Sequence, residues 1–587
     1  MRRGAAKQPR MRTPLRFVLS FALSFVLRAE EGVQTAARLL PPETVMFAEL
    51  HDVQRTVERL MQSSWGDLAR EPEVGGFLGK LIAAAAKEAP MELRESLGQI
   101  AKTLPVSGFF AMTEMPDFQN PSAHAVPKML LGASYRGEPQ VMENLLQKLR
   151  DSVLKNASVK QAKGTIEGTE IETFADSDFS VSFAHADKQV LLATDRKLLT
   201  QALARRAGRG SRSLADTEGW QAVEKEAVTS PDATGFLSYD AFLEKLSSAA
   251  GRDAAAITAM RSLMPQFLSV STKFDGPLMR ERAYLHYRMV LPRMESKHRS
   301  LAFTGEDTFA YLESSLATMG MTVDKLIESN PLLKEAGSEL EKHGLTLADI
   351  SHTFGPEISF VSDWESGGLA IPTAFAAVEV RDLEKARKFI GMITEAIDPE
   401  GKLIEKEHRG AKLWSMKGPV PLVQPTVALS GTHLMFGLNP GTVTAALDHL
   451  ASGKSALAES ASFTGALKTV GEPNGGLGFI DSARLVERLY DRMRPFIAVA
   501  IAGNPKVSEF LDASMLPKTA ALARHMPPFV AGFHAGQHGY VVESTGPVTY
   551  VAGVGGVALI AGFSIPVMTA ARARAAEKAA RGAEKQQ

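Results

Sequence analysis

The chain has 587 residues, of which 45% are hydrophobic and 22% are charged, a composition typical of a folded protein of roughly two to four domains. Lys plus Arg and Asp plus Glu number 66 each, so no global basic field favours a nucleic-acid partner. The absence of cysteine excludes disulfides, thiolate nucleophiles, Cys-ligated zinc and iron–sulfur clusters.

The N-terminal segment has the pattern of a secretory signal peptide, which we expect to cover residues 1–29. An apolar run from Phe17 to Leu27 follows a basic stretch and is short for a membrane span. A start at either Met1 or Met11 fits this pattern. A short core helix is the alternative interpretation.

Two regions of the chain resemble one another in five pairs of segments that keep the same order. The clearest pair is KQVLLATDRKLLTQAL (188–203) and THLMFGLNPGTVTAAL (432–447). Another pair places Trp220 opposite Phe463. This similarity predicts an internal duplication.

We therefore expect two tandem related units, residues 38–293 and 294–546, with an insertion near 490–515 in the second unit. Strands and helices interleave in each unit without a regular βαβ period, which predicts an α+β fold with mainly antiparallel sheets and packed helices. The expected strands, in chain order, are Val45–Leu50, Gly108–Thr113, Met129–Tyr135, Phe309–Leu312, Ile358–Val361 and Thr373–Val380. Amphipathic helices are expected over Val141–Val153 and Ala386–Ile397.

A long uncharged stretch near the C-terminus predicts one transmembrane helix over residues 547–571. As a helix, Val548–Ala571 would extend about 36 Å, enough to cross a hydrocarbon core of about 30 Å. Basic residues follow this stretch, and no Lys or Arg lies between Arg524 and Arg572. The positive-inside rule then places a tail, 572–587, in the cytoplasm and the preceding units outside. A buried core helix is the alternative.

The short motif SGKS (452–455) resembles the end of a phosphate-binding loop. The first glycine of that loop is replaced by Asp448, and the motif follows an expected helix instead of a strand. We therefore interpret Gly453 as a helix C-cap.

Two other polar groupings are interpreted as turns. His534 and His538 in HAGQH could grip a metal on a helix, but the neighbouring glycines favour a hairpin. Asp176 and Asp178 stand between two expected strands, where such residues favour turns. We therefore assign no catalytic, cofactor-binding or metal-binding residue, and we expect no cofactor.

Several segments resemble an uncharacterised group of bacterial envelope proteins, the domain-of-unknown-function family 3352. These segments are LPPETVMFAELHD, FGPEISFV, SALAESASFTGAL, ARHMPPFVAGFHAGQHGYVVESTGP and IPVMTAARARAAEKAAR. The resemblance covers about residues 38–575 and rests on loose motifs. It implies an exported region and a hydrophobic C-terminal segment, and it carries no catalytic role.

These features together predict a non-enzymatic, membrane-anchored binding or scaffolding protein whose bulk is extracytoplasmic, in the periplasm. The expected partners are the membrane and either an envelope protein or an apolar ligand, but no nucleic acid. One alternative is an envelope hydrolase whose carboxylates and histidines, such as His51 or His352, meet only in the fold. Another is a carrier that holds an apolar ligand between the two units.

Overall fold

The structure is a computed structural model that describes residues 36–88, 105–115, 127–154, 158–176, 180–249, 261, 264–288, 290, 296–315, 340–365, 372–398, 403–416 and 423–550. The expected signal peptide, 1–29, and the expected cytoplasmic tail, 572–587, lie outside the described residues.

All strands of the described residues belong to one sheet of 20 strands, and every pairing among them is antiparallel. From one edge to the centre, the first half runs β4 (Lys160–Ile166), β5 (Thr169–Ala175), β6 (Ser180–Ala186), β7 (Gln189–Ala193), β3 (Lys128–Tyr135), β2 (Pro105–Glu114), β1 (Met46–Leu50), β8 (Ala233–Ser238), β9 (Phe267–Asp275) and β10 (Leu278–His286).

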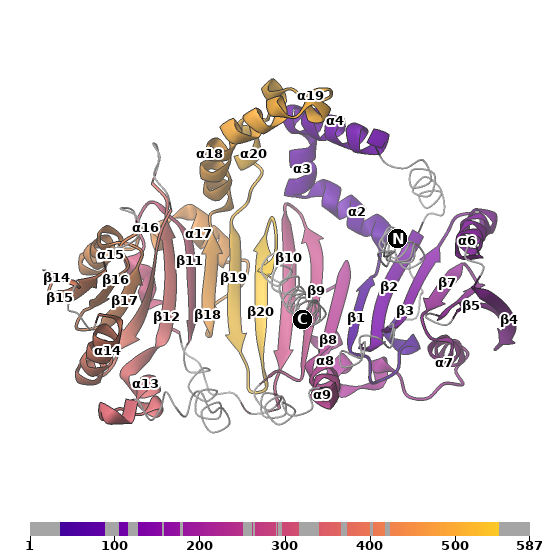
Figure 1. Ribbon diagram of the computed structural model, residues 1–587, viewed down its shortest axis with the longest axis horizontal. Helices are drawn as coiled ribbons and strands as arrows, with labels where there is room; N and C mark the ends of the chain where they lie inside the picture. The colour runs from indigo at the N-terminus through magenta and orange to yellow at the C-terminus, as the bar shows by residue number, and fades with distance from the viewer. Residues whose placement is uncertain are drawn as a thin grey trace, which may run out of the picture.

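The second half repeats this strand order from the opposite edge. It runs β14 (Ile404–His408), β15 (Ala411–Ser415), β16 (Thr426–Leu429), β17 (His433–Gly437), β13 (Thr373–Val380), β12 (Phe354–Asp363), β11 (Thr308–Ser315), β18 (Gly476–Ile480), β19 (Phe529–Ala535) and β20 (Gly539–Gly546). The halves join where β10 pairs with β20, in the middle of Figure 1.

The two halves also share their register, so residues can be matched across them. We call two residues counterparts when they hold the same place in strand order and register. Starting from Gly235 and Gly478, successive pairings make Leu192 the counterpart of Phe436. These two residues also stand opposite each other in the alignment of segments 188–203 and 432–447.

The junction between the halves contains an ion pair on the approximate two-fold axis. Register makes Arg282 on β10 and Glu543 on β20 counterparts, and the two also pair directly with each other. Nη1 of Arg282 donates to Oε1 of Glu543 over 2.6 Å. Identical halves would place like charges on this axis, so the Arg–Glu combination favours joining two different halves.

The fold-class prediction is wrong in its separate sheets and in its C-terminal transmembrane helix. Pairing of β10 with β20 merges the expected sheets into one, which also removes two unpaired edges. Among the helices that the structure describes, none is both long and apolar enough to cross a membrane. The expected span lies outside the described residues from position 551 onward.

The start of that expected span belongs to the folded body. Thr549 is buried and its hydroxyl donates to Oε2 of Glu281 over 2.7 Å. The ring of Tyr550 packs edge-on against Phe533, with 5.5 Å between centroids. The chain therefore stays on the sheet to residue 550, which the lack of charge in this stretch did not reveal.

Helices cover both faces of the sheet. The α6 face carries α6 (Pro139–Leu154) in the first half and α14 (Leu383–Ile397) in the second. The opposite face carries η1 (Ala36–Leu39), α7 (Arg196–Arg206), η2 (Leu214–Asp216) and α8 (Glu218–Glu226), and in the second half η4 (Arg299–Phe303), α15 (Pro440–Ser452), α16 (Ala456–Glu459) and α17 (Ala461–Leu467). Two further helices are α9 (Tyr239–Ala249) and α13 (Leu347–Thr353).

Each half has its own main hydrophobic core. The core lies under α7 and α8 in the first half and under α15 and α17 in the second. Trp220 and Phe463, aligned in sequence, are both buried in these cores. Trp220 packs edge-on against Phe236 with 5.9 Å between centroids, and Phe463 packs edge-on against Phe479 at 5.2 Å. The same aromatic pair therefore anchors both cores.

An arch of helices beyond the strand ends links the halves a second time (Figure 1). It consists of α2 (Val53–Gln62), α3 (Ser64–Arg70) and α4 (Pro72–Glu88) from the first half, and α18 (Ser482–Gly503), α19 (Pro505–Ser508), η5 (Ala513–Met515) and α20 (Thr519–Ala523) from the second. Phe77 joins an apolar cluster around Ile501, and Lys518 Nζ lies 3.1 Å from Glu73 Oε1. The expected insertion near 490–515 lies within this arch.

Candidate functional site

The main candidate site is a cavity of about 440 Å³ on the α6 face, at the outer edge of the first half. The helical spacing along α6 and the alternation of residues along the strands direct the polar side chains of both into the space between helix and sheet. The lining residues are Glu143, Gln147, Arg150 and Leu154 from α6, and Gln161, Lys163, Glu170, Glu172, Phe183 and His185 from β4, β5 and β6.

Arg150 and Glu172 form the centre of this cavity. The side chain of Arg150 is 13% exposed and that of Glu172 only 5%. Nη2 of Arg150 donates to Glu172 Oε1 over 2.7 Å, and Nη1 donates to Glu143 Oε1 over 2.5 Å. The guanidinium also lies over the Phe183 ring, 5.2 Å from its centroid. Gln161 Nε2 donates to the second oxygen of Glu172 over 2.9 Å.

The rim of the cavity carries a second ion pair and a histidine. Lys163 Nζ lies 2.9 Å from Glu170 Oε1. Nε2 of His185 lies 2.6 Å from the Tyr135 hydroxyl, and its Nδ1 lies 3.6 Å from Glu143 Oε2. The lining therefore offers hydrogen-bonding groups of both charges.

The ion pairs hold three of these groups in their charged forms. The hydrogen bond to Glu170 raises the pKa of Lys163, and the same bond lowers the pKa of Glu170. Burial opposes the charge of Arg150, but hydrogen bonds to Glu172 and Glu143 outweigh it and raise the arginine pKa. These shifts move the three pKa values further from neutral pH. A general acid or base works best with a pKa near the operating pH.

The same place in the second half is packed with apolar side chains. The counterpart of Glu172 is Trp414, and the counterpart of His185 is Leu429. Both belong to an apolar cluster beneath α14. The fold therefore does not require charge at these positions, although burying a charged pair there carries a desolvation penalty.

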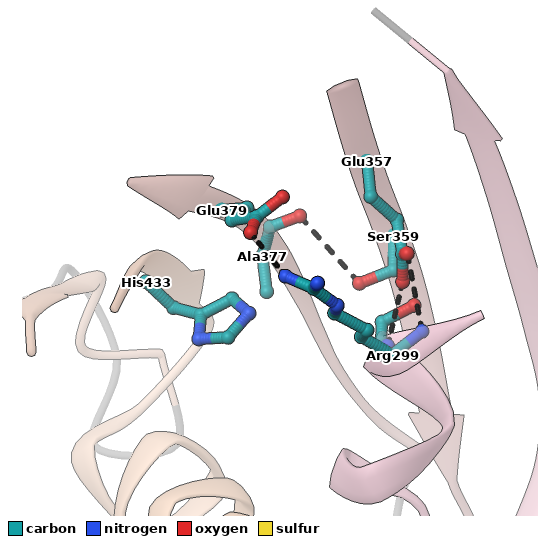
Figure 2. Close-up of a pocket in the computed structure, with 7 residues that line it drawn as sticks. Arg299, Glu357, Ser359, Ala377, Glu379 and His433 are labelled. Carbon is teal, nitrogen blue, oxygen red and sulfur yellow. Dashed lines mark hydrogen bonds and ion pairs between the residues drawn. The ribbon is translucent and has the colours of Figure 1, made fainter. Parts of the chain in front are cut away.

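A second, smaller pocket lies on the opposite face in the second half, between η4 and strands β12, β13 and β17 (Figure 2). Nη1 of Arg299 donates to Glu379 Oε1 over 2.7 Å, while the backbone N–H of Arg299 donates to Glu357 Oε2 over 3.1 Å. Burial lowers the pKa of His433, and nearby Arg299 lowers it further against the opposing effect of Glu379. The void measures about 10 Å³, roughly the space of one water molecule.

At the corresponding place in the first half, an aromatic ring occupies the space of this small pocket. The counterparts of Ser359 and Ala377 are Phe109 and Gly132. The Phe109 ring lies directly over Gly132, where an added Cβ would be only 2.0 Å from Phe109 Cε1. The aromatic ring therefore fills the space that serine and alanine leave open in the second half.

Each half also buries one glutamate on its central strand, and the two are counterparts. Glu313 accepts hydrogen bonds from the Ser296 hydroxyl and from Nδ1–H of His298. Nε2 of His298 lies 3.2 Å from the Pro473 carbonyl, so both ring nitrogens face acceptors. Burial opposes protonation of His298, but Glu313 outweighs it and raises the histidine pKa.

Glu49, the counterpart in the first half, lacks such a partner. Its Oε1 accepts the backbone N–H of Ala36 over 3.3 Å, and its buried Oε2 has no hydrogen bond. His51 Nδ1 lies 3.8 Å from that Oε2, beyond hydrogen-bond distance. Burial raises the pKa of Glu49 to about 7.

The histidines that the sequence suggested for a hydrolase do not meet. His51 Nε2 lies 2.8 Å from the Thr234 hydroxyl, and burial lowers its pKa. His352 is an exposed residue of α13, with Nδ1 2.8 Å from the Ala348 carbonyl. The two belong to different halves of the sheet and neither lines the main cavity.

Two of the other motifs have the structure expected from the sequence. Gly453 caps α15 with φ of 64°, so it is a helix C-cap. His534 lies on β19 and His538 in the turn that follows it, which confirms the hairpin. Asp176 follows β5, whereas Asp178 lies outside the described residues. Within the described ranges, no group of three or more His, Asp or Glu side chains is placed to hold a metal ion.

Sequence reasoning did not find the cavity residues. A usable indication existed, because the two copies differ there: the first copy has Glu172 where the second has Trp414. A charged residue that replaces a core aromatic in a duplicated fold marks a place where the copies diverge. Comparing the copies position by position would therefore have pointed to this edge.

Comparisons with known proteins add little to this geometry. No protein-family model matches the chain, and no curated protein matches it either. Among solved structures, crystal forms III and IV of a protein named TP0453 match with 8% and 9% identity. They cover 44% and 43% of this chain and 81% and 79% of theirs, with TM-scores of 0.24 and 0.23.

Proposed function

We propose that the protein is a non-enzymatic binding protein and that the cavity beneath α6 holds a polar solute. One observation carries this proposal: the cavity of about 440 Å³ is lined by charged and amide side chains at the place where the other half is packed with Trp414 and Leu429. Since the fold is satisfied by apolar packing there, the polar lining is best explained by a ligand.

The charges in the cavity favour binding over acid–base chemistry. Arg150 is bonded to two carboxylates, and Lys163 and Glu170 hold each other ionised. None of these three groups is shifted toward neutrality. The hydrolase alternative therefore lacks support from this geometry.

A carrier of apolar ligands between the halves is also less well supported. The halves meet along the β10–β20 ladder, whose partners are paired continuously from Met279 to His286. Small apolar residues, Ala283, Ala531 and Val542, pack at this junction. An extracytoplasmic location stays a prediction from the N-terminal sequence.

Binding can be tested on the full chain by isothermal titration calorimetry with four probes: glucose, glycine, spermidine and glycerol 3-phosphate. We expect at least one probe to bind. Glu170→Ala, at the exposed rim of the cavity, should then weaken binding about tenfold, because one hydrogen-bonding carboxylate is lost.

Lys412→Ala provides the matched control, because Lys412 is the exposed counterpart of Glu170 in the second half. This variant should leave binding unchanged. Failure of all four probes to bind, or equal loss of binding in both variants, would contradict the proposed site.

A further inference from the structure

Two carboxylates of the cavity beneath α6 use one oxygen each for a partner in the protein. Oε1 of Glu143 accepts from Nη1 of Arg150 over 2.5 Å. Oε1 of Glu170 accepts from Nζ of Lys163 over 2.9 Å. Among the residues that the structure describes, no donor lies within hydrogen-bond distance of Oε2 of either glutamate. The two glutamate side chains are 43% and 62% exposed, so a solute in the cavity can reach them.

Both of these carboxylates lie beside His185, at one end of the cavity. Oε2 of Glu143 is 3.6 Å from Nδ1 of His185. Because Ile171 pairs with Ala184, the preceding residue of β5, Glu170, and the following residue of β6, His185, are cross-strand neighbours. The open carboxylates therefore approach the same imidazole from two elements, α6 and β5.

The cations of the cavity are already bonded to its carboxylates. Arg150 donates to Glu172 and Glu143. Lys163 donates to Glu170. The lining contains three carboxylates and only these two cations, so an anionic solute would meet excess negative charge and would compete with carboxylates for its donors. A cationic solute would instead meet carboxylate oxygens that have no partner.

Both open carboxylates have basic counterparts in the second half. Register makes Lys412 the counterpart of Glu170. On the helices, α6 and α14 bury side chains at the same spacing, which makes Arg387 the counterpart of Glu143. The matched buried residues are Met142, Leu145 and Leu146 in α6 and Ala386, Phe389 and Ile390 in α14. The fold therefore accepts the opposite charge at both places, and the negative charge is particular to the first half.

The cavity also offers an apolar surface to a solute. Leu154 lines it from the end of α6 and is 40% exposed. The helical rise places Leu154 about 16 Å beyond Glu143 along the helix axis. An aliphatic chain attached to a cation beside His185 would extend toward Leu154 and bury apolar surface there.

We propose that the polar solute of this cavity is an aliphatic amine whose ammonium group is held beside His185 by Glu143 and Glu170. The ammonium donates to the two Oε2 atoms, while Arg150 and Lys163 keep their own carboxylate partners. This inference rests on the proposed function and adds the charge and the chemical class of the solute.

Isothermal titration calorimetry on the full chain with spermidine, glucose and glycerol 3-phosphate tests the charge of the solute. These three probes are a cation, a neutral polyol and an anion. We expect spermidine to bind at least tenfold more tightly than either of the other two.

Glu170→Gln separates charge from hydrogen bonding, because the amide keeps an acceptor of similar size. Glu170→Gln and Glu143→Gln should each weaken spermidine binding about tenfold, since hydrogen bonds between charged groups are the stronger ones. The matched control is Glu138→Gln, because Glu138 is an exposed carboxylate directly before α6 and is not part of the cavity lining. This control should leave binding unchanged. Glu170 is exposed, so its variant tests the inference even if Glu143→Gln lowers stability.

The outcomes separate this inference from the proposed function. If glucose or glycerol 3-phosphate binds more tightly than spermidine, and Glu170→Ala weakens that binding, the proposed function holds and the inference is overturned. Failure of every probe to bind would contradict both. Spermidine binding that is unchanged in Glu170→Gln, or equally weakened in Glu138→Gln, would also overturn the inference.

Discussion

The two halves of the sheet share strand order and register but place charge in opposite locations. Beneath α6, the first half buries Glu172 and Arg150 where the second half has Trp414 in an apolar cluster. On the other face, the first half packs Phe109 over Gly132 where the second half has a small polar pocket. The same backbone therefore accepts polar or apolar side chains both beneath α6 and on the opposite face. Folding alone does not explain why one half has charged groups there.

The largest expected effect is loss of one partner of the buried ion pair in the first half. Glu172→Ala leaves the mostly buried Arg150 with Glu143 as its remaining carboxylate partner, and we expect the free energy of unfolding to fall by about 3 kcal/mol. Urea denaturation followed by circular dichroism measures this change.

A double variant supplies the control for that experiment. Glu172→Leu combined with Arg150→Met imitates the apolar packing of the second half and should recover most of the lost stability. If the double variant is as unstable as Glu172→Ala, the first half needs its charges for folding and the comparison between the halves fails.

A smaller effect is expected where Phe109 covers Gly132. Gly132→Ala would place a Cβ 2.0 Å from Phe109 Cε1, so the ring must move, and overpacking of this kind reduces stability by about 1–3 kcal/mol. Adding Phe109→Ser to Gly132→Ala reproduces the second half, with its Ser359 and Ala377. This pair of variants should relieve the clash, and thermal denaturation of the single and double variants checks it.

The buried glutamates predict two different pH windows for stability. The folded pKa of Glu49, about 7, exceeds its ordinary value of 4.5, so the folded state favours the protonated acid. Its stabilising contribution is complete below about pH 4.5 and disappears as the pH rises through about 7. Glu49→Gln should remove this part of the pH dependence, as measured by urea midpoints from pH 4 to 8.

In the second half, the pH dependence comes from His298. Its folded pKa lies above the ordinary 6.5, so its contribution is complete below pH 6.5 and disappears as the pH rises through the raised value. His298→Gln should flatten the stability curve only above about pH 6.5. Coincident windows for the two variants would contradict the distinction between Glu49 and Glu313.

The smallest expected effect concerns the rim of the cavity. Lys163 and its counterpart Glu405 are exposed, and exposed ion pairs add little to stability. Lys163→Ala and Glu405→Ala should both leave the Tm unchanged in differential scanning calorimetry. A clear loss of Tm in Lys163→Ala alone would mean that the rim pair supports the first half instead of serving a ligand.

Local features of this fold could be predicted from the sequence. The six expected strands coincide with β1, β2, β3, β11, β12 and β13 within a few residues, because alternating apolar residues and turn residues determine strands locally. The helix cap at Gly453 was found in the same way. The alignment of the two copies placed Trp220 opposite Phe463, and the structure buries both.

Features that depend on distant contacts could not be predicted. The local sequence pattern of β10 and β20 does not indicate that they pair with each other, because both have the pattern of ordinary half-buried strands. The ion pair of Arg150 and Glu172 joins a helix and a strand, and no local sequence pattern indicates that these two side chains meet. The uncharged C-terminal stretch suggested a membrane span, and its hydropathy gave no sign that Thr549 and Tyr550, at its start, pack on the sheet.

Hydrogen exchange with and without the probe that binds shows which half of the sheet holds the solute. We expect slower amide exchange in α6, β5 and β6 when the probe is present, with no change in α14, β15 and β16. Equal protection in both halves, or protection confined to the second half, would contradict the conclusion that the first half has diverged to bind a polar solute.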